Sequence, residues 1–322
     1  MRVLIVTNMY PDATRPYNGI FVSEQIAAIK AYHPDVEFDV CNIDGAKGKI
    51  EYLKSIYYVN QRIRKGQYDL VHIHFGLSGL YLLSPFKTKV PTLVTFHGSD
   101  IQPAGENGLL TVCISRYVAK KTDACITLNH KMDTMVKVYN SNTFIVPCAV
   151  NTKIFYPHKV SKKQGVIQVV FPCNHGMAVK DYPLFCNVLE ILRKRYRVKC
   201  EEKELAGLSR TQVADLFNQA DVLLMTSKSE GSPQAVKEAL ACNLPIVSTP
   251  VGDVEYLLSG VKNCFVSQTR KEEELAHLVI RSLFHESKGM TGHEKIRLLR
   301  LDEKSIADKI YKVYEESKYK RH

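Results

Sequence analysis

The stretch Ala220–Gly252, ADVLLMTSKSEGSPQAVKEALACNLPIVSTPVG, joins a short apolar run to a marked helix start. Val222–Met225 predicts a buried strand that runs into a loop ending at Gly231. Ser232 and Pro233 then predict the first residues of a helix, because serine accepts an orphan N–H group at an N-cap and proline lacks one at the first helical position. A strand, a short loop and a helix in this order are typical of a parallel α/β sheet.

The predicted helix start has the features of a phosphate site. The N–H groups of Gln234 and Ala235 would point out of the helix end, where the helix dipole is positive. Glu230 lies just before this end and Glu238 lies about one and a half turns inside the helix. A carboxylate repels phosphate but accepts hydrogen bonds from hydroxyls, so we expect the pair to bind the ribose and the hexose of a nucleoside-diphosphate sugar. Two solvated carboxylates would explain the spacing equally well.

The alternation of strands and helices continues on both sides of this stretch. In the first half, strands are predicted at Val3–Val6, Val36–Cys41, Leu70–Ile73, Thr92–Phe96, Ala124–Leu128 and Thr143–Val146. Helices are predicted between them at Phe21–Tyr32, Ile50–Lys65, Leu110–Lys121 and Lys131–Tyr139. In the second half, strands are predicted at Ile167–Phe171, Asp221–Met225 and Pro245–Ser248, and helices at Tyr182–Arg195, Ser209–Asn218, Pro233–Cys242, Glu272–His285 and Glu303–Tyr319.

One α/β pattern that runs twice predicts two Rossmann-like domains facing a cleft. We expect an N-terminal acceptor-side domain at 1–150 and a C-terminal donor domain at 151–302, with 151–165 as the linker. A final helix at 303–322 is expected to pack back toward the N-terminal domain. The second domain looks short of one strand–helix unit, because only 197–205, with the polar run KCEEKE, lies between two predicted helices.

Cysteine content and hydropathy indicate a cytoplasmic protein. The nine cysteines are scattered, with no C-x-x-C pair, which favours reduced thiols over disulfides or zinc. The apolar run Val3–Val6 is too short for a signal-peptide core. No stretch approaches the roughly 20 apolar residues of a membrane helix.

The net charge of +11 suggests an anionic partner. Nucleic acid is not expected, because the chain has neither a zinc finger nor an RNP motif and lacks tryptophan. Peripheral contact with an anionic membrane, on the cytoplasmic face, is suggested by the basic run Arg62–Lys65 and by the apolar stretch Leu77–Phe86, followed by Lys87 and Lys89. A generally basic surface remains an alternative.

The motif that begins at Glu230 resembles the Glu–seven residues–Glu motif of family 4 glycosyltransferases, which have the GT-B fold. The matching residues are Glu230-Gly-Ser-Pro, Glu238-Ala-Leu-Ala, Asp221, Ser227, Pro245–Ser248 and Val251-Gly252. The similarity covers nearly the whole chain. It implies a retaining enzyme that moves a hexose-type sugar from a nucleotide-sugar donor to a glycan or lipid-linked acceptor, in cell-surface polysaccharide synthesis. No cofactor or metal is expected, since the chain has no Asp-x-Asp pair.

The resemblance also implies roles for residues of the second domain. Glu230 would hold donor-sugar hydroxyls, Glu238 the ribose, and Lys180 the diphosphate, whose growing negative charge a lysine stabilises. The family usually has a Gly-Arg pair a few residues before this lysine, where this chain has Pro-Cys-Asn174-His175-Gly. Asn174 or His175 would have to substitute for the missing arginine.

In the first domain the resemblance points to Gly19 and His97. Gly19 follows the first strand and would let the backbone approach the donor phosphate, although an ordinary turn glycine is nearly as good an explanation. His97 closes the fourth strand, where it would contact the donor sugar and stabilise the transition state, with Asp100 orienting it. Asn129 is a further candidate at the end of the fifth strand, and acceptor choice is expected in loops such as Ile101–Gly108.

Other functions fit the sequence less well. His72, His74 and His97 suggest a metal hydrolase, but no further ligand is evident and H-E-x-x-H is absent. A dehydrogenase is disfavoured because G-x-G-x-x-G does not follow the first strand. A nucleotide-sugar epimerase and a non-catalytic nucleotide-sugar-binding protein remain as alternatives, and product analysis would separate them from a transferase.

Overall fold

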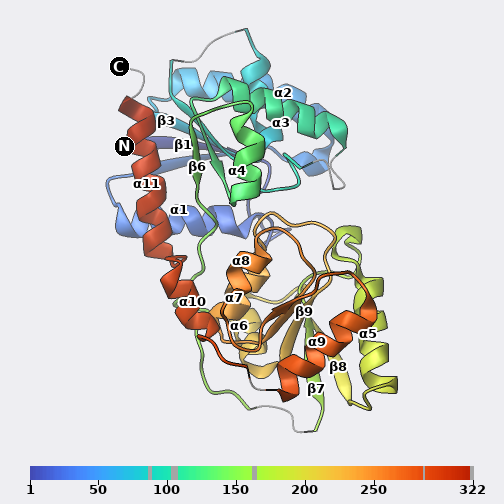
Figure 1. The fold of residues 1–322 in the computed structure, drawn as a ribbon. Helices are drawn as coiled ribbons and strands as arrows, with labels where there is room; N and C mark the ends of the chain where they lie inside the picture. Colours follow the sequence, from blue (N-terminus) through green and yellow to red (C-terminus); the bar gives the residue numbers. More distant parts are fainter. Residues whose placement is uncertain (86–88, 103–107, 162–164, 286, 320–322) are drawn as a thin grey trace. The chain divides into compact units, whose positions relative to one another are not determined.

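Two separate parallel β-sheets, each in its own compact unit, make up the computed structural model of the chain (Figure 1). The structure describes residues 1–85, 89–102, 108–161, 165–285 and 287–319. Unit 1 comprises Met1–Ala149 together with Glu303–His322, and unit 2 comprises Val150–Asp302. The C-terminal helix therefore belongs to the same unit as the N-terminus.

Unit 1 holds a six-stranded parallel sheet in the order β2-β1-β3-β4-β5-β6. Its elements are β1 (Arg2–Thr7), α1 (Ile20–Tyr32), β2 (Glu37–Asn42), η1 (Gly45–Lys47), α2 (Lys49–Lys65), β3 (Leu70–His74), η2 (Gly76–Leu83), β4 (Thr92–Thr95), α3 (Leu109–Lys121), β5 (Ala124–Thr127), α4 (His130–Lys137), β6 (Thr143–Ile145) and α11 (Glu303–Tyr319). The central strands are apolar on both faces, as crossover helices on both sides of a parallel sheet require.

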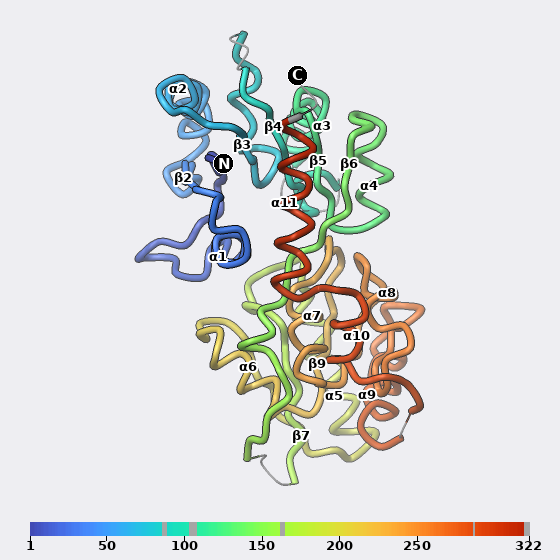
Figure 2. The backbone as a smooth tube through the Cα atoms, turned by 90° about the vertical axis from the view of Figure 1, so that its left-hand side faces the viewer, coloured from blue at the N-terminus to red at the C-terminus, as the bar shows by residue number. Residues whose placement is uncertain are grey.

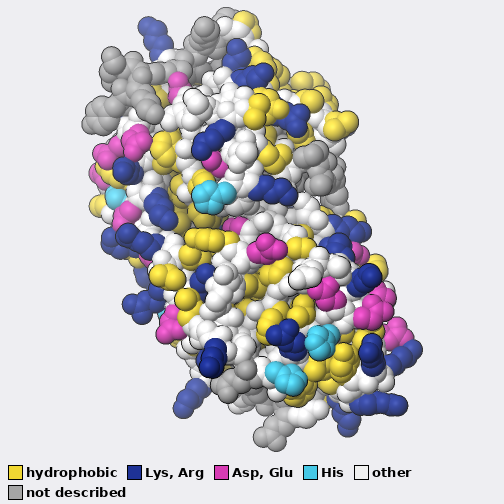
Figure 3. Space-filling model, in the orientation of Figure 1, with side chains coloured by type: hydrophobic (Ala, Val, Ile, Leu, Met, Phe, Trp, Pro, Cys, Tyr) yellow, Lys and Arg dark blue, Asp and Glu magenta, His cyan; other side chains and the backbone are white. Residues whose placement is uncertain are grey.

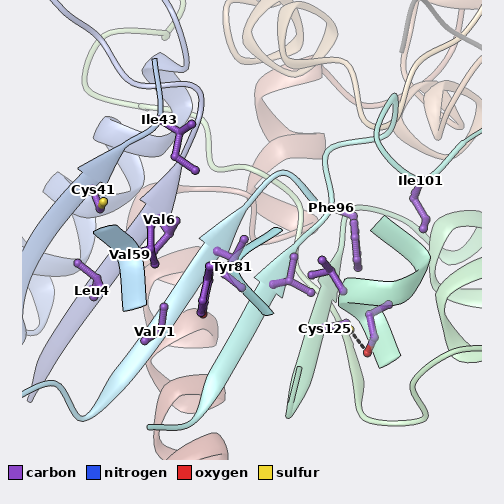
Figure 4. Close-up of a cluster of buried hydrophobic side chains, with 14 of the residues drawn as sticks. Leu4, Val6, Cys41, Ile43, Val59, Val71, Tyr81, Phe96, Ile101 and Cys125 are labelled. Atoms are coloured by element: carbon purple, nitrogen blue, oxygen red, sulfur yellow. Dashed lines mark hydrogen bonds between the residues drawn. The ribbon is translucent and has the colours of Figure 1, made fainter. Parts of the chain in front are cut away.

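One face of this sheet packs against α2, η2 and α3. Leu4, Val6 and Val71 point from the strands toward Val59 of α2 and Tyr81 of η2, and all five side chains are fully buried (Figure 4). In the apolar stretch that is predicted to favour membrane contact, residues 78–81 are buried, whereas Leu83 is 45% exposed. Phe86 and Lys87, at its end, lie outside the described residues.

The C-terminal helix α11 packs against α1 (Figures 1 and 2). Its apolar stripe, Ile306, Ile310 and Val313, is buried in unit 1. On the α1 side, His33 Nε2 lies 2.9 Å from an oxygen of Asp308, and its ring stacks on Tyr311 at 4.0 Å. These contacts explain why the chain returns to unit 1 after Asp302.

Unit 2 holds a five-stranded parallel sheet in the order β11-β10-β9-β7-β8. Its elements are β7 (Ile167–Phe171), η3 (Ala178–Lys180), α5 (Tyr182–Lys194), β8 (Cys200–Glu204), α6 (Arg210–Gln219), β9 (Val222–Met225), α7 (Gln234–Ala241), β10 (Ile246–Ser248), α8 (Val254–Leu258), β11 (Phe265–Val266), α9 (Glu272–Phe284) and α10 (Gly292–Leu298).

The polar run before α6 contains a strand that the sequence did not reveal. Cys200–Glu204 form β8 at the edge of the sheet, where polar residues are tolerated, and no further helix lies between β8 and α6 in this fully described stretch. The described part of the predicted linker makes contacts with unit 2. Phe155 is fully buried and its ring lies 6.3 Å from that of Phe217 on α6. Phe155 therefore anchors the segment to unit 2, while its other described residues are exposed or half-buried.

Helix starts are predicted well where side chains cap them. Ser209 forms a capping box with Gln212 at the start of α6, as its position predicts. At α7, however, Pro233 occupies the N-cap position and Gln234 is the first helical residue, so the predicted cap at Ser232 is wrong by one residue.

The nine cysteines all lie in the described part of the chain, and all are free. Across the described ranges, no helix combines the length and the apolar character needed to cross a membrane.

Candidate functional site

Glu238 is held inside unit 2 by an arginine that the sequence did not reveal. Helix α7 is buried from Val236 to Ala241, and the Glu238 side chain is 4% exposed. Arg210 donates to Glu238 Oε1 over 2.6 Å, and its guanidinium lies 4.7 Å from the centre of the Phe155 ring. A solvated helix carboxylate is thereby excluded as an explanation for Glu238.

The second carboxylate, Glu230, pairs with Lys180. Lys180 Nζ donates to Glu230 Oε1 over 2.6 Å, and the two side chains are 18% and 14% exposed. Thr226, just after β9, donates its hydroxyl to the carbonyl of Lys180 over 2.9 Å. The turn that carries the lysine is thus fastened to the strand end that leads to Glu230.

Arg270 joins the same two loops from a third direction. Its guanidinium pairs with Asp181 over 2.6 Å and donates to the carbonyls of Ser227 (2.5 Å) and Thr226 (2.8 Å). Arg210 and Arg270 both lie far from their partners along the chain, so no local spacing could have identified them. Each is recognisable only once the fold brings the loops together.

Backbone packing fixes the loop before α7. Gly252 has φ +57°, and a Cβ atom there would lie 2.4 Å from the carbonyl oxygen of Gly231. The loop after β10 thus lies directly on the loop that leads to α7. Behind it, burial raises the pKa of Asp253, and the nearby charge of the fully buried Lys237 lowers it in turn.

Gln234 and Ala235 lie in the first turn of α7, so their N–H groups are part of the positive end of the helix dipole. Ser232 is buried just before this turn. Glu230 lies in the loop before this turn, and Glu238 lies one turn further into α7.

Asn174 and His175 lie in an exposed turn after β7. Asn174 Oδ1 accepts the N–H of Gly176 over 2.7 Å. The His175 ring stacks on Tyr182 at 3.9 Å, and its Nε2 lies 2.5 Å from Glu202 Oε1. Both side chains make local contacts, and neither reproduces the guanidinium of the family's arginine.

In unit 1, His97 follows β4 in a loop that Asp100 organises. Asp100 Oδ1 accepts the N–H groups of His97 and Gly98, each over 3.0 Å, and Oδ2 accepts that of Gly76 over 2.9 Å. These bonds hold the loop backbone, whereas the expectation was that Asp100 orients the imidazole. The carboxyl group is fully buried, which raises its pKa to about 6.

The His97 ring itself contacts other aromatic rings. It lies 4.7 Å from the ring of Phe21 on α1, and its Nε2 is 3.2 Å from Nδ1 of His74 at the end of β3. His72, two residues earlier on β3, is also fully buried. Within the described ranges, no three His, Cys, Asp or Glu side chains are grouped so that they could hold a metal ion.

Gly19 and Asn129 have structural roles in unit 1. Gly19 precedes α1 with φ +64°, and a Cβ atom there would lie 2.2 Å from the carbonyl oxygen of Met9, so the close approach it permits is to the chain's own backbone. Asn129 caps α4 by accepting the N–H of Met132 over 2.8 Å. Residues 103–107 of the expected acceptor loop lie outside the described residues.

Comparison with known proteins covers both units. The family model described as Glycosyltransferase Family 4 matches residues 2–154, and the one described as Glycosyl transferases group 1 matches residues 187–284. A Bacillus subtilis protein named as a teichuronic acid biosynthesis glycosyltransferase is 19% identical, over 87% of this chain and 89% of its own length.

Solved structures agree with the predicted fold. Sucrose-phosphate synthase from Thermosynechococcus elongatus superposes with a TM-score of 0.80 at 15% identity over 98% of both chains. Anabaena HepE in complex with UDP gives a TM-score of 0.70 at 14% identity, over 98% of this chain and 100% of that one. These similarities confirm the GT-B fold class, and together with the family matches they show that the chain is a glycosyltransferase that belongs to family 4.

Proposed function

We propose that this enzyme transfers a hexose-type sugar, with retention of configuration, from a nucleotide-sugar donor to a glycan or lipid-linked acceptor in cell-surface polysaccharide synthesis. The observation that carries the proposal is the pair of carboxylate–cation contacts before and within α7, Lys180 with Glu230 and Arg210 with Glu238. Both are largely shielded from water, which strengthens electrostatic interactions with a bound donor.

The two pairs match the two kinds of group in a nucleotide-sugar. The diphosphate is anionic and suits Lys180 and the N-terminal turn of α7. The ribose and hexose carry hydroxyls, which suit Glu238 and Glu230. Each carboxylate pairs with a cation of the chain itself, so in this proposal donor binding exchanges internal ion pairs for contacts with the donor. HepE has been crystallised with UDP and with UDP-glucose, so uridine donors are the first to test.

In this proposal, positively charged groups of the protein stabilise the leaving diphosphate. Lys180 stabilises the charge that grows on the diphosphate as the sugar departs. No metal cofactor is required, and the sequence has no Asp-x-Asp pair that would hold one.

Retention is proposed because both carboxylates of the site already pair with cations of the chain, Glu230 with Lys180 and Glu238 with Arg210. In the proposed route the acceptor enters on the leaving-group face and the departing phosphate takes its proton. His97 contacts the donor sugar and stabilises the transition state.

Product analysis tests the proposal. The enzyme is incubated with α-linked UDP-, GDP- and ADP-sugars and a mixture of glycan and lipid-linked acceptors, and NMR identifies the anomer formed. We expect an α-linked product, with His97→Ala losing most activity and leaving the anomer unchanged. A β-linked product would overturn retention. Conversion of the donor sugar without an acceptor would identify an epimerase. Donor binding without turnover would identify a non-catalytic nucleotide-sugar-binding protein.

We further propose that unit 1 contacts an anionic membrane on the cytoplasmic face through α2. Lysine and arginine side chains are spread over the visible face of the molecule with acidic residues among them, so overall charge alone does not define a patch (Figure 3). On α2, however, Ile50, Leu53 and Tyr57 are 55%, 58% and 72% exposed at helical spacing. The exposed basic residues around them are Lys47, Lys49, Lys54, Arg62, Arg64 and Lys65. An apolar stripe flanked by cations is typical of helices that lie in a membrane interface.

A further inference from the structure

A chain of hydrogen bonds leads from His97 into the interior of unit 1. His97 Nε2 lies 3.2 Å from His74 Nδ1, and His74 Nε2 lies 3.4 Å from Nε2 of Gln25 on α1. His74 is fully buried and lies at the carboxyl end of β3, next to β4 in the sheet. The His97 ring therefore contacts the imidazole of His74, and the other ring nitrogen of His74 contacts the amide of Gln25.

The chain continues to the C-terminal helix. Gln25 also hydrogen-bonds the phenol of Tyr314 on α11. The Tyr314 hydroxyl lies 2.8 Å from His72 Nδ1, and His72 Nε2 lies 2.8 Å from Thr95 Oγ1. Tyr314 and His72 are fully buried. The first helix, two strand ends and the last helix are thus joined by one polar network inside an apolar core.

The direction of these bonds follows from the amide of Gln25. Burial lowers the pKa of His72 to about 3 and that of His74 well below its usual value, so both rings are neutral and each has one N–H and one acceptor nitrogen. The Gln25 nitrogen can only donate, so His74 Nε2 accepts and His74 carries its proton on Nδ1. That N–H in turn donates to His97 Nε2.

The other branch agrees with this direction. The second N–H of the Gln25 amide donates to the Tyr314 oxygen, which leaves the phenol O–H to donate to His72 Nδ1. His72 then carries its proton on Nε2 and donates to Thr95 Oγ1. Every bond in the network has one donor and one acceptor, as a buried polar network requires.

We infer that His74, set by Gln25, is a positioning residue that fixes the orientation of the His97 ring and holds neutral His97 as the tautomer protonated on Nδ1. The inference rests on the proposed function only in its consequence for catalysis. With Nε2 occupied by the His74 N–H and Nδ1 already protonated, His97 has no lone pair to accept a proton from the substrate. It is then unable to act as the general base that an inverting reaction needs.

Nitrogen-15 NMR of the histidine-labelled protein without substrate tests this inference. His97 signals are assigned by their loss in His97→Gln. In the wild type we expect His97 Nδ1 to be protonated and Nε2 to be the acceptor nitrogen. In Gln25→Glu, measured at mildly alkaline pH, the carboxylate can only accept. His74 must then place its proton on Nε2, and the proton of His97 must move from Nδ1 to Nε2.

Two further variants complete the design. His74→Phe keeps a ring of similar size but removes the partner, so His97 should become a mixture of tautomers. Gln61→Glu introduces the same charge on α2, outside the network, and should leave the His97 spectrum unchanged. The inference is overturned if wild-type His97 is protonated on Nε2, or if Gln25→Glu and His74→Phe fold normally and leave its tautomer unchanged. The readout needs no substrate, so failure to find transfer activity would count against the proposed function alone.

Discussion

Lys180, Glu230 and Glu238 illustrate what single residues reveal before a structure is known. Glu230 and Glu238 were identified from the motif around one strand–helix turn, and Lys180 from the family resemblance, by its place after the first strand of the second domain. Arg210 could not be identified, since its pairing with Glu238 over 2.6 Å depends on how α6 packs beside α7. The chemical classes of the site were thus predictable, whereas the partners that neutralise its carboxylates were not.

Asp100 gives unit 1 a pH-dependent stability. Burial raises its pKa to about 6, so the folded protein binds this proton more tightly than the unfolded chain, where the pKa is about 3.9. The contribution of Asp100 to the free energy of unfolding is therefore present in full below pH of about 4 and is lost as the pH rises to about 6. A shift of this size corresponds to about 3 kcal/mol.

Asp100→Asn tests this effect by urea unfolding across that pH range. The variant cannot titrate at this position, so the stability difference between wild type and variant should shrink by about 3 kcal/mol from acid to neutral pH. The amide also has one oxygen for three N–H donors, which should cost about 1–3 kcal/mol through the bond it loses. A difference that stays constant with pH would show that Asp100 is ionised throughout.

At the scale of helices and strands, hydrophobic periodicity located most elements within a few residues. It failed for elements whose polarity does not follow the usual pattern of their class. The strand β8 is polar because it lies at a sheet edge, and η2 is apolar because it is core, so neither has the pattern of its class. The start of α7 was displaced by one residue because Pro233 adopts extended backbone and precedes the helix.

Gly252 should be required for the geometry of the loop before α7. Alanine there incurs the cost of a left-handed backbone, about 1–2 kcal/mol, and also drives a Cβ atom against the Gly231 carbonyl. Gly207 is a matched control, since it has φ +78° and a Cβ atom there would meet nothing within 4 Å. We expect Gly252→Ala to lower the melting temperature more than Gly207→Ala and to weaken nucleoside-diphosphate binding. Equal effects of the two changes would contradict a role for backbone contact.

We expect the exposed apolar residues of α2 to be required for binding to anionic membranes. In vesicle flotation at low salt we expect the wild type to float with anionic liposomes and to be released at high salt, since basic residues contribute roughly 1 kcal/mol each near anionic lipid. Leu53→Gln combined with Tyr57→Gln should abolish flotation. Leu298→Gln, which changes a residue that is 64% exposed in unit 2, is the control. No flotation of the wild type would remove the proposal, and equal loss in the control would remove α2 from it.

At the scale of the whole molecule, repetition of one α/β pattern was enough to predict two sheets. Assigning α11 to a unit requires tertiary structure, because its stripe of Ile306, Ile310 and Val313 would suit any apolar face. In the structure this stripe is buried in unit 1, and Tyr314 reaches the network behind His97. The last helix of the chain thereby supports His97, a candidate residue in the first third of the sequence.

The central claim is that unit 2 binds a nucleoside diphosphate without metal through Lys180 and the carboxylates at α7. Calorimetric titration of UDP, GDP and ADP in the presence of a chelator tests it most directly. We predict that at least one of them binds, that Glu238→Ala weakens this binding about tenfold or more, equivalent to about 1.4 kcal/mol, and that Glu190→Ala, which removes an exposed carboxylate elsewhere in unit 2, has no effect. Lys180→Ala should lower turnover more than binding, because the charge it stabilises grows in the transition state. Binding that appears only with magnesium or manganese, or that is unchanged in Glu238→Ala, would contradict the account.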